Sequence, residues 1–139
     1  MVTFDQFISQ WNGRYLDFDG KFGYQCMDLF RKYLVDVCGL PAYNPFPGVS
    51  YAKNLWNYSP LQFEKIKNTP TGIPSKGDIV IWGTYVFVTG IAGHVGIFTE
   101  GDVNKFISFD QNYAPTGSPC KLNKHSYKGV LGWFRLNPK

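Results

Sequence analysis

The segment Asp17–Tyr33 has the sequence DFDGKFGYQCMDLFRKY, in which a cysteine stands directly behind a group of carboxylates. From the cysteine onward, apolar residues recur at the spacing of one helical face: Cys26, Leu29, Phe30, Tyr33, Leu34 and Val37. Gly39 and Pro41 then predict the end of this helix. The segment therefore predicts an acidic loop that leads into the clearest helix of the chain.

The rest of the chain divides into helices followed by strands. Thr3 and Gln6 form a capping box, which predicts a helix over residues 3–12, and a shorter helix is expected from Ser50. After Pro60, β-branched and aromatic segments separated by turn residues predict strands near Phe63–Lys67, Asp78–Thr84, His94–Thr99, Lys105–Asn112 and Val130–Leu136. This order indicates an α+β fold, and 139 residues with 44% hydrophobic content are expected to form a single domain over residues 1–139.

Composition excludes several classes of protein. The three cysteines, Cys26, Cys38 and Cys120, stand at wide and irregular spacing, which argues against a disulfide framework and a zinc site. The net charge is +4 and the basic residues are spread out, so a nucleic-acid partner is not expected. No signal peptide and no membrane span are expected, because the N-terminus lacks a basic region followed by an apolar one and no run of about 18 apolar residues occurs.

Cys26 is a candidate nucleophile because of its place in the helix. The first turn of a helix carries unpaired N–H groups and the positive end of the helix dipole, which favour a thiolate over a thiol. The alternative is that Cys26 is one more core residue, since it shares the apolar stripe with Leu29 and Tyr33. A base near the thiol would favour catalysis.

His94 is the candidate base. A hairpin folded symmetrically about Asp102 would place His94 directly opposite Asp110, so that the imidazole would touch a carboxylate. A register shifted by two residues would bring Asn112 there instead, and both remain candidates. The other histidine, His125, stands among lysines and is expected to be solvated surface.

The acids before the helix have a spacing like that of a calcium-binding loop. Counted from Asp17, they and the turn residues fall at positions 1, 3, 5, 7 and 12, which are Asp17, Asp19, Lys21, Gly23 and Asp28. Three carboxylates and the carbonyls of Lys21 and Gly23 would suit a Ca²⁺ ion. The loop is no true EF-hand, because position 5 is lysine and glycine stands at position 4. Alternatively, Asp17 and Asp19 only shape a turn and Asp28 balances the helix N-terminus.

Four segments in order resemble one known family. They are Asp17–Tyr33, GDIVIW at Gly77–Trp82, GHVGIF at Gly93–Phe98 and ISFDQN at Ile107–Asn112. Together they closely resemble the CHAP domain, the cysteine, histidine-dependent amidohydrolase/peptidase family of peptidoglycan hydrolases. The resemblance covers nearly the whole chain and implies a papain-like fold, with N-terminal helices packed on a C-terminal antiparallel sheet.

The resemblance also implies roles for individual residues. Cys26 would be the nucleophile, His94 the base, and Asp110 with Asn112 the orienting partners, while Gln25 would help to hold the oxyanion. Many members resembling this chain have glutamate in place of Asp110, so either Asp110 or Asn112 would orient the imidazole. Similar loops in phage members favour calcium as the metal.

The implied partner is bacterial peptidoglycan, in which the enzyme would cut an amide bond as an N-acetylmuramoyl-L-alanine amidase or as an endopeptidase of the stem or cross-bridge. A phage endolysin would be made in the host cytoplasm without a signal peptide and act on the cell wall, alone or with other domains of a larger lysin. The NlpC-type peptidases are a rival family, but their third polar residue is commonly histidine. A non-catalytic or calcium-stabilised wall-binding module with the same fold is a second alternative.

Overall fold

The computed structural model describes residues 1–20, 25–84, 90–113 and 117–138. Two α-helices, α1 (Phe4–Trp11) and α2 (Cys26–Asp36), come first, and a 3-10 helix, η1, follows at Ala52–Asn57. The described residues contain six strands: β1 (Phe63–Lys67), β2 (Ile79–Trp82), β3 (His94–Gly101), β4 (Lys105–Asp110), β5 (Lys121–Ser126) and β6 (Val130–Leu136). The chain is thus an α+β protein, as its sequence predicts.

Local sequence explains where the two α-helices begin. At α1, the Thr3 hydroxyl accepts from the Gln6 N–H at 3.1 Å, and the Gln6 side chain accepts from the Thr3 N–H at 2.8 Å. At α2, the N–H of Gln25 donates to the Asp28 carboxylate at 2.8 Å. Gly39 follows α2 with a φ of 68°, a left-handed conformation that suits glycine after a helix. The predicted capping box and the two longer predicted helices are therefore confirmed.

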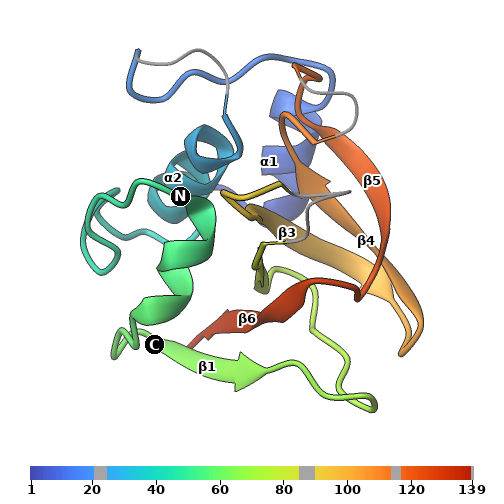
Figure 1. Cartoon of the computed structure of the whole chain (residues 1–139). Helices are drawn as coiled ribbons and strands as arrows, with labels where there is room; N and C mark the ends of the chain where they lie inside the picture. Colours follow the sequence, from blue (N-terminus) through green and yellow to red (C-terminus); the bar gives the residue numbers. More distant parts are fainter. Residues whose placement is uncertain (21–24, 85–89, 114–116, 139) are drawn as a thin grey trace.

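All strands pair in one antiparallel sheet with the order β1-β6-β2-β3-β4-β5 (Figure 1). Five of the strands lie where the sequence predicts them. The sixth, β5, was not predicted, because its residues are mostly polar and its neighbours include several lysines. Among the described residues, no helix is both long enough and apolar enough to cross a membrane.

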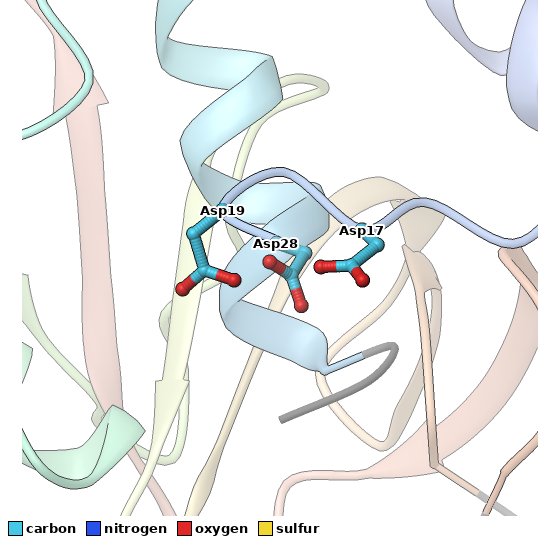
Figure 2. A group of neighbouring side chains, drawn as sticks. All are labelled: Asp17, Asp19 and Asp28. Atoms are coloured by element: carbon cyan, nitrogen blue, oxygen red, sulfur yellow. The ribbon is translucent and has the colours of Figure 1, made fainter. Parts of the chain in front are cut away.

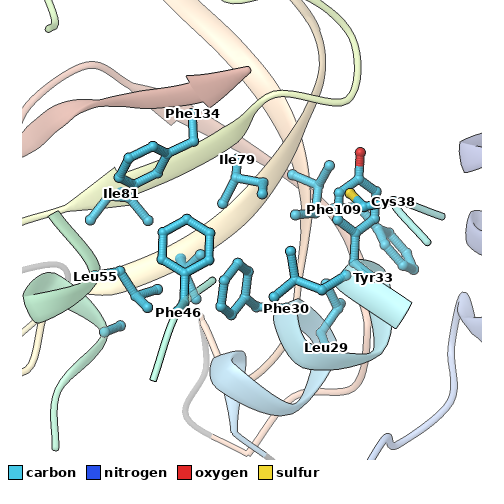
Figure 3. Close-up of a cluster of buried hydrophobic side chains, with 14 of the residues drawn as sticks. Leu29, Phe30, Tyr33, Cys38, Phe46, Leu55, Ile79, Ile81, Phe109 and Phe134 are labelled. Carbon is cyan, nitrogen blue, oxygen red and sulfur yellow. The ribbon is translucent and has the colours of Figure 1, made fainter. Parts of the chain in front are cut away.

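The main core lies between the helices and one face of the sheet. Figure 3 shows Leu29, Phe30 and Tyr33 of α2 facing Ile79, Phe109 and Phe134 of the strands. Phe46 lies among them, with its ring centroid 5.0 Å from that of Phe134. The apolar stripe of α2 is thus buried against the sheet, which fixes the start of this helix relative to the strands.

A second cluster covers the other face of the sheet and consists of Val80, Trp82, Phe98, Phe106, Val130 and Trp133. Along β4, Phe106, Ser108 and Asp110 alternate with the core-facing Phe109 and therefore share this second face. The ring of Trp82 contacts that of His94, with centroids 5.1 Å apart. His94 and Asp110 therefore lie on the face that the second cluster covers.

The register of the β3–β4 hairpin differs from the predicted one by two residues. The turn is not centred on Asp102, because the Asp102 carboxylate accepts from the N–H groups of Asn104 and Lys105 and so caps the start of the turn. Next to the turn Gly101 pairs with Phe106, three residues from the predicted register, and a bulge between Phe98 and Glu100 takes one residue back. Ile97 pairs with Phe109, and continuing this register places Gly96, not His94, across from Asp110. The predicted direct opposition of His94 and Asp110 was wrong.

Candidate active site

Cys26 is the first residue of α2 and the half-buried member of three cysteines, since Cys38 and Cys120 are buried. Its position brings the thiol to the N-terminal end of the helix, where N–H groups and the helix dipole stabilise negative charge. Burial raises the pKa of the Cys120 thiol to about 12, so that thiol stays protonated at neutral pH. Cys26 is therefore the thiol best placed to react.

His94 lies at the start of β3 and is 4% exposed. Burial by itself lowers the pKa of an imidazole, but hydrogen bonding with Asp110 and Cys26 and the charges of both groups raise the pKa of His94 to about 10. The rings of Trp82 and Tyr113 flank it, each with its centroid 5.1 Å away. The site thus favours an imidazolium paired with a carboxylate.

Asp110 is completely buried and supplies that carboxylate. Its Oδ2 atom lies 3.4 Å from Nε2 of His94, although the two residues are diagonal rather than directly opposed in the sheet. Gly96 makes this diagonal contact possible, because a Cβ atom there would lie only 2.7 Å from Oδ2 of Asp110. Burial tends to raise the pKa of Asp110, but the two histidines that face it lower that pKa to about 2. The carboxylate is therefore ionised.

Asn112 lies outside the strand and in the left-handed region, with a φ of 60°. Its amide nitrogen donates to the Gln25 side chain at 3.4 Å, and its amide oxygen accepts from the N–H of Gly117 at 2.5 Å. Of the two candidates for the orienting role, the structure brings Asp110 to the imidazole and directs Asn112 to the residue before the cysteine. Gln25 itself is exposed beside Cys26.

His125 is not the solvated residue that the sequence indicates. It is 6% exposed, and its Nε2 atom donates to Oδ2 of Asp110 at 3.0 Å. The neighbouring lysines misled the prediction, because in β5 Lys124 points to solvent while the alternate positions Asn123 and His125 point to Asp110. Recognising a strand here from the polar sequence alone would have required the pairing with β4.

Gln111 is a buried residue that sequence reasoning missed. Its amide accepts from the N–H of Leu16 at 2.7 Å and donates at 2.8 Å to the carbonyls of both Leu16 and Gln25. These bonds connect the end of β4 to the acidic loop and to the start of α2. The available signal was a polar residue at the core-facing position after Phe109, which needs polar partners when buried.

Figure 2 shows that the carboxylates of Asp17, Asp19 and Asp28 gather beside the start of α2. One oxygen from each lies within 4.8 Å of the others. Burial, assisted by the charge of Asp19, raises the pKa of Asp28, although its oxygens accept from the N–H groups of Phe18 and Gln25. Lys21 and Gly23, the other two predicted metal ligands, lie outside the described residues.

Comparison with known proteins gives consistent matches. Residues 15–112, more than half of the chain, match the model of the CHAP domain family. Endolysin PlyTW of Staphylococcus phage Twort (strain DSM 17442 / HER 48) is 32% identical over 130 residues, which cover 87% of this chain and 27% of PlyTW. The chain therefore spans well under half of that relative's length.

Two solved structures have the same fold. Wild-type endolysin LysIME-EF1 superposes with a TM-score of 0.76 and 29% sequence identity, over 98% of this chain and 65% of that one. Ly7917 superposes with a TM-score of 0.67 over 94% of this chain and 60% of that one, and its 17% identity shows the likeness of fold alone. The match of the family model over residues 15–112, with the helices and antiparallel sheet that these structures share, identifies this chain as a member of the CHAP domain family.

Proposed function

We propose that this protein is a peptidoglycan hydrolase that cleaves an amide bond of the bacterial cell wall with Cys26 as its nucleophile. The observation that carries the proposal is the arrangement at the start of α2, where a half-buried thiol helps to raise the pKa of a buried imidazole that pairs with an ionised carboxylate. The endolysins PlyTW and LysIME-EF1 support peptidoglycan as the substrate class.

The chemistry follows from these three side chains. His94 holds the proton of Cys26, and the Sγ thiolate attacks the carbonyl carbon of the scissile amide to form a tetrahedral oxyanion. The oxyanion collapses, the C–N bond breaks, and His94 delivers its proton to the leaving amine. His94 then takes a proton from a water molecule, whose oxygen attacks the thioester. The C–S bond breaks, the carboxylic acid product is released, and the thiolate of Cys26 is regenerated. Asp110 orients the imidazole and stabilises its cation throughout.

Two groups beside Cys26 are suited to hold the oxyanion. The backbone N–H of Cys26 lies in the first turn of α2, where it has no partner within the helix. Gln25 supplies the second donor through its side-chain amide, which the contact with Asn112 holds next to the thiol. Asn112 therefore acts on the oxyanion side of the site and Asp110 on the imidazole side.

We also propose that Asp17, Asp19 and Asp28 bind Ca²⁺. The residues fit this ion, because oxygens that all lie about 2.3–2.6 Å from one Ca²⁺ are at most about 5 Å apart, and the three carboxylates satisfy that limit. Carbonyls of Lys21 and Gly23 would complete the ligand set. The ion would neutralise three crowded acids and stiffen the loop that leads into α2, since Asp28 also accepts from Gln25, the residue before the nucleophile.

The amide bond that is cut belongs either to the link between N-acetylmuramic acid and L-alanine or to the stem peptide or cross-bridge. The enzyme would be made in a phage-infected host cell, act on the cell wall, and work alone or with other domains of a larger lysin. The alternative is a calcium-stabilised wall-binding module without catalysis.

The test is digestion of purified peptidoglycan, with mass spectrometry of the products. We expect new amino termini, whose identity distinguishes amidase from endopeptidase cleavage, and we expect Cys26→Ala to release none while retaining the wild-type melting temperature. Iodoacetamide should label Cys26 and stop the release, whereas the buried Cys38 and Cys120 stay unlabelled in the folded protein. Turnover by folded Cys26→Ala would overturn the cysteine mechanism. Wall binding by the wild type without any product would favour the binding module.

A further inference from the structure

Two histidines share the carboxylate of Asp110. Its Oδ2 atom lies 3.0 Å from Nε2 of His125 and 3.4 Å from Nε2 of His94. Ser108 donates to the same oxygen, and Asn123 donates to the other one. Of the two imidazoles, His94 is the one whose pKa Cys26 helps to raise. His125 therefore lies behind the carboxylate and contacts the candidate base only through it and through ring packing.

His125 is packed among aromatic rings, and its polar contact is the hydrogen bond to Asp110. Its ring is enclosed by the rings of Trp82, Phe106 and Tyr113, with centroids 4.8, 5.2 and 4.5 Å away. Its Nδ1 atom is buried and has no hydrogen-bond partner in the part of the chain that the structure describes. The bond from Nε2 to Asp110 is therefore the polar contact through which this buried ring acts.

The position of Asp110 explains why such a donor is useful. Asp110 is diagonal to His94 in the sheet, so its short side chain must be held across Gly96 to reach the imidazole. The bond from His125 adds to those from Ser108 and Asn123, and without it Oδ2 could shift relative to His94, which would change the distance between the two groups. His125 supplies this oxygen with a donor from β5, which lies on the other side of β4 from β3 and His94.

We propose that His125 is a positioning residue that acts through Asp110, holding Oδ2 in the orientation that aligns His94 with Cys26. This inference depends on the proposed cysteine mechanism. His125 takes no part in proton transfer to substrate, and its contribution is made through the hydrogen bond from Nε2. Removing that bond therefore slows the chemical step and leaves substrate binding nearly unchanged.

The experiment compares four variants for release of new amino termini from purified peptidoglycan. His125→Phe keeps an aromatic ring and removes the donor, whereas His125→Gln keeps a donor at a similar reach. We expect His125→Phe to lower kcat by about tenfold to a hundredfold, because misplacement of a catalytic group by about 1 Å can cost about a hundredfold in rate, with KM changed less than about twofold. His125→Gln should restore most of kcat. His125→Phe should cost little further activity when added to Asp110→Asn, because the two residues act as a unit.

Controls separate positioning from packing and from the mechanism itself. Phe98→Leu loosens the same cluster through Phe106 without touching His125, so it should lower the melting temperature and leave kcat unchanged. His125→Leu removes the donor with less bulk and is interpreted in the same way if His125→Phe does not fold. Wild-type kcat in a donor-free variant would overturn the inference, and so would losses that add to that of Asp110→Asn. Turnover by Cys26→Ala would instead overturn the proposed mechanism.

Discussion

Gly96→Ala is expected to weaken catalysis, because the added methyl group would displace the carboxylate of Asp110. The added Cβ atom would lie 2.7 Å from Oδ2 of Asp110 and 3.1 Å from both the Asp110 Cβ and the Ser108 hydroxyl. Because ordinary contacts begin near 3.4 Å, the carboxylate must retreat by about 0.7 Å from β3. His94 also lies on β3, so the distance of 3.4 Å between Oδ2 and Nε2 would lengthen beyond a useful ion pair.

The magnitude follows from this geometry. Asp110 is buried and held by several donors, so moving its carboxylate would break or lengthen those bonds. Misplacement of a catalytic group by about 1 Å can cost about a hundredfold in rate, and a shift somewhat smaller predicts a loss in kcat of about tenfold to a hundredfold. Overpacking by one methyl group should lower the free energy of unfolding by about 1–3 kcal/mol.

The assay measures kcat on purified peptidoglycan together with the melting temperature. Gly83→Ala is the matched control, because Gly83 is also buried and its Cβ would meet the Leu131 side chain at 3.1 Å, which can move aside without disturbing Asp110. Gly83→Ala should lower stability and spare kcat. Wild-type kcat in a folded Gly96→Ala variant would refute the argument that Asp110 must lie across this glycine.

Three further outcomes are expected. The pKa of His94 is raised to about 10, so protonated His94 stabilises the fold fully below pH 6.5, the ordinary pKa of histidine, and this stabilisation is lost as pH rises through about 10. The pKa of Asp110 is lowered to about 2, so ionised Asp110 stabilises the fold above pH 3.8, the ordinary pKa of aspartate, and this stabilisation is lost as pH falls through about 2. Urea unfolding should therefore give a maximum between about pH 4 and 6.5, and an unchanged alkaline decline in His94→Gln would contradict this account. Asp110→Asn should lower kcat more than Asn112→Ala, and the reverse order would transfer the orienting role to Asn112. Calcium at a hundredfold excess over Kd should stabilise the protein by about 2.7 kcal/mol, and a chelator should remove this stabilisation. The Asp19→Asn variant should not respond to calcium, whereas the control Glu64→Gln should respond like the wild type. A melting temperature that chelation leaves unchanged would show that the acids only form a turn.

Features encoded by neighbouring residues were predictable. The capping box at Thr3 and Gln6, the apolar stripe of α2 and its end before Gly39 depend on contacts within a few residues, and the structure contains all of them. Five strands were predicted for the same reason, since alternation and turn residues are local patterns. The polar strand β5 lacks such a pattern, and its strand conformation is set by pairing with β4.

The contacts of the candidate site divide in the same way. Helical periodicity alone specifies that Cys26 begins a helix, and the order of acids alone specifies that Asp17 and Asp19 precede it, because both follow from positions along one segment. The partner of His94 depends instead on how β3 and β4 align, and an Asp102 cap with a bulge beyond Phe98 moved that alignment by two residues. A shift of two residues keeps every side chain on its face of the sheet but changes its neighbours. Only the assembled sheet therefore places Gly96, which has no side chain, where Asp110 reaches across it to His94. The assembled sheet also brings His125 to the same carboxylate.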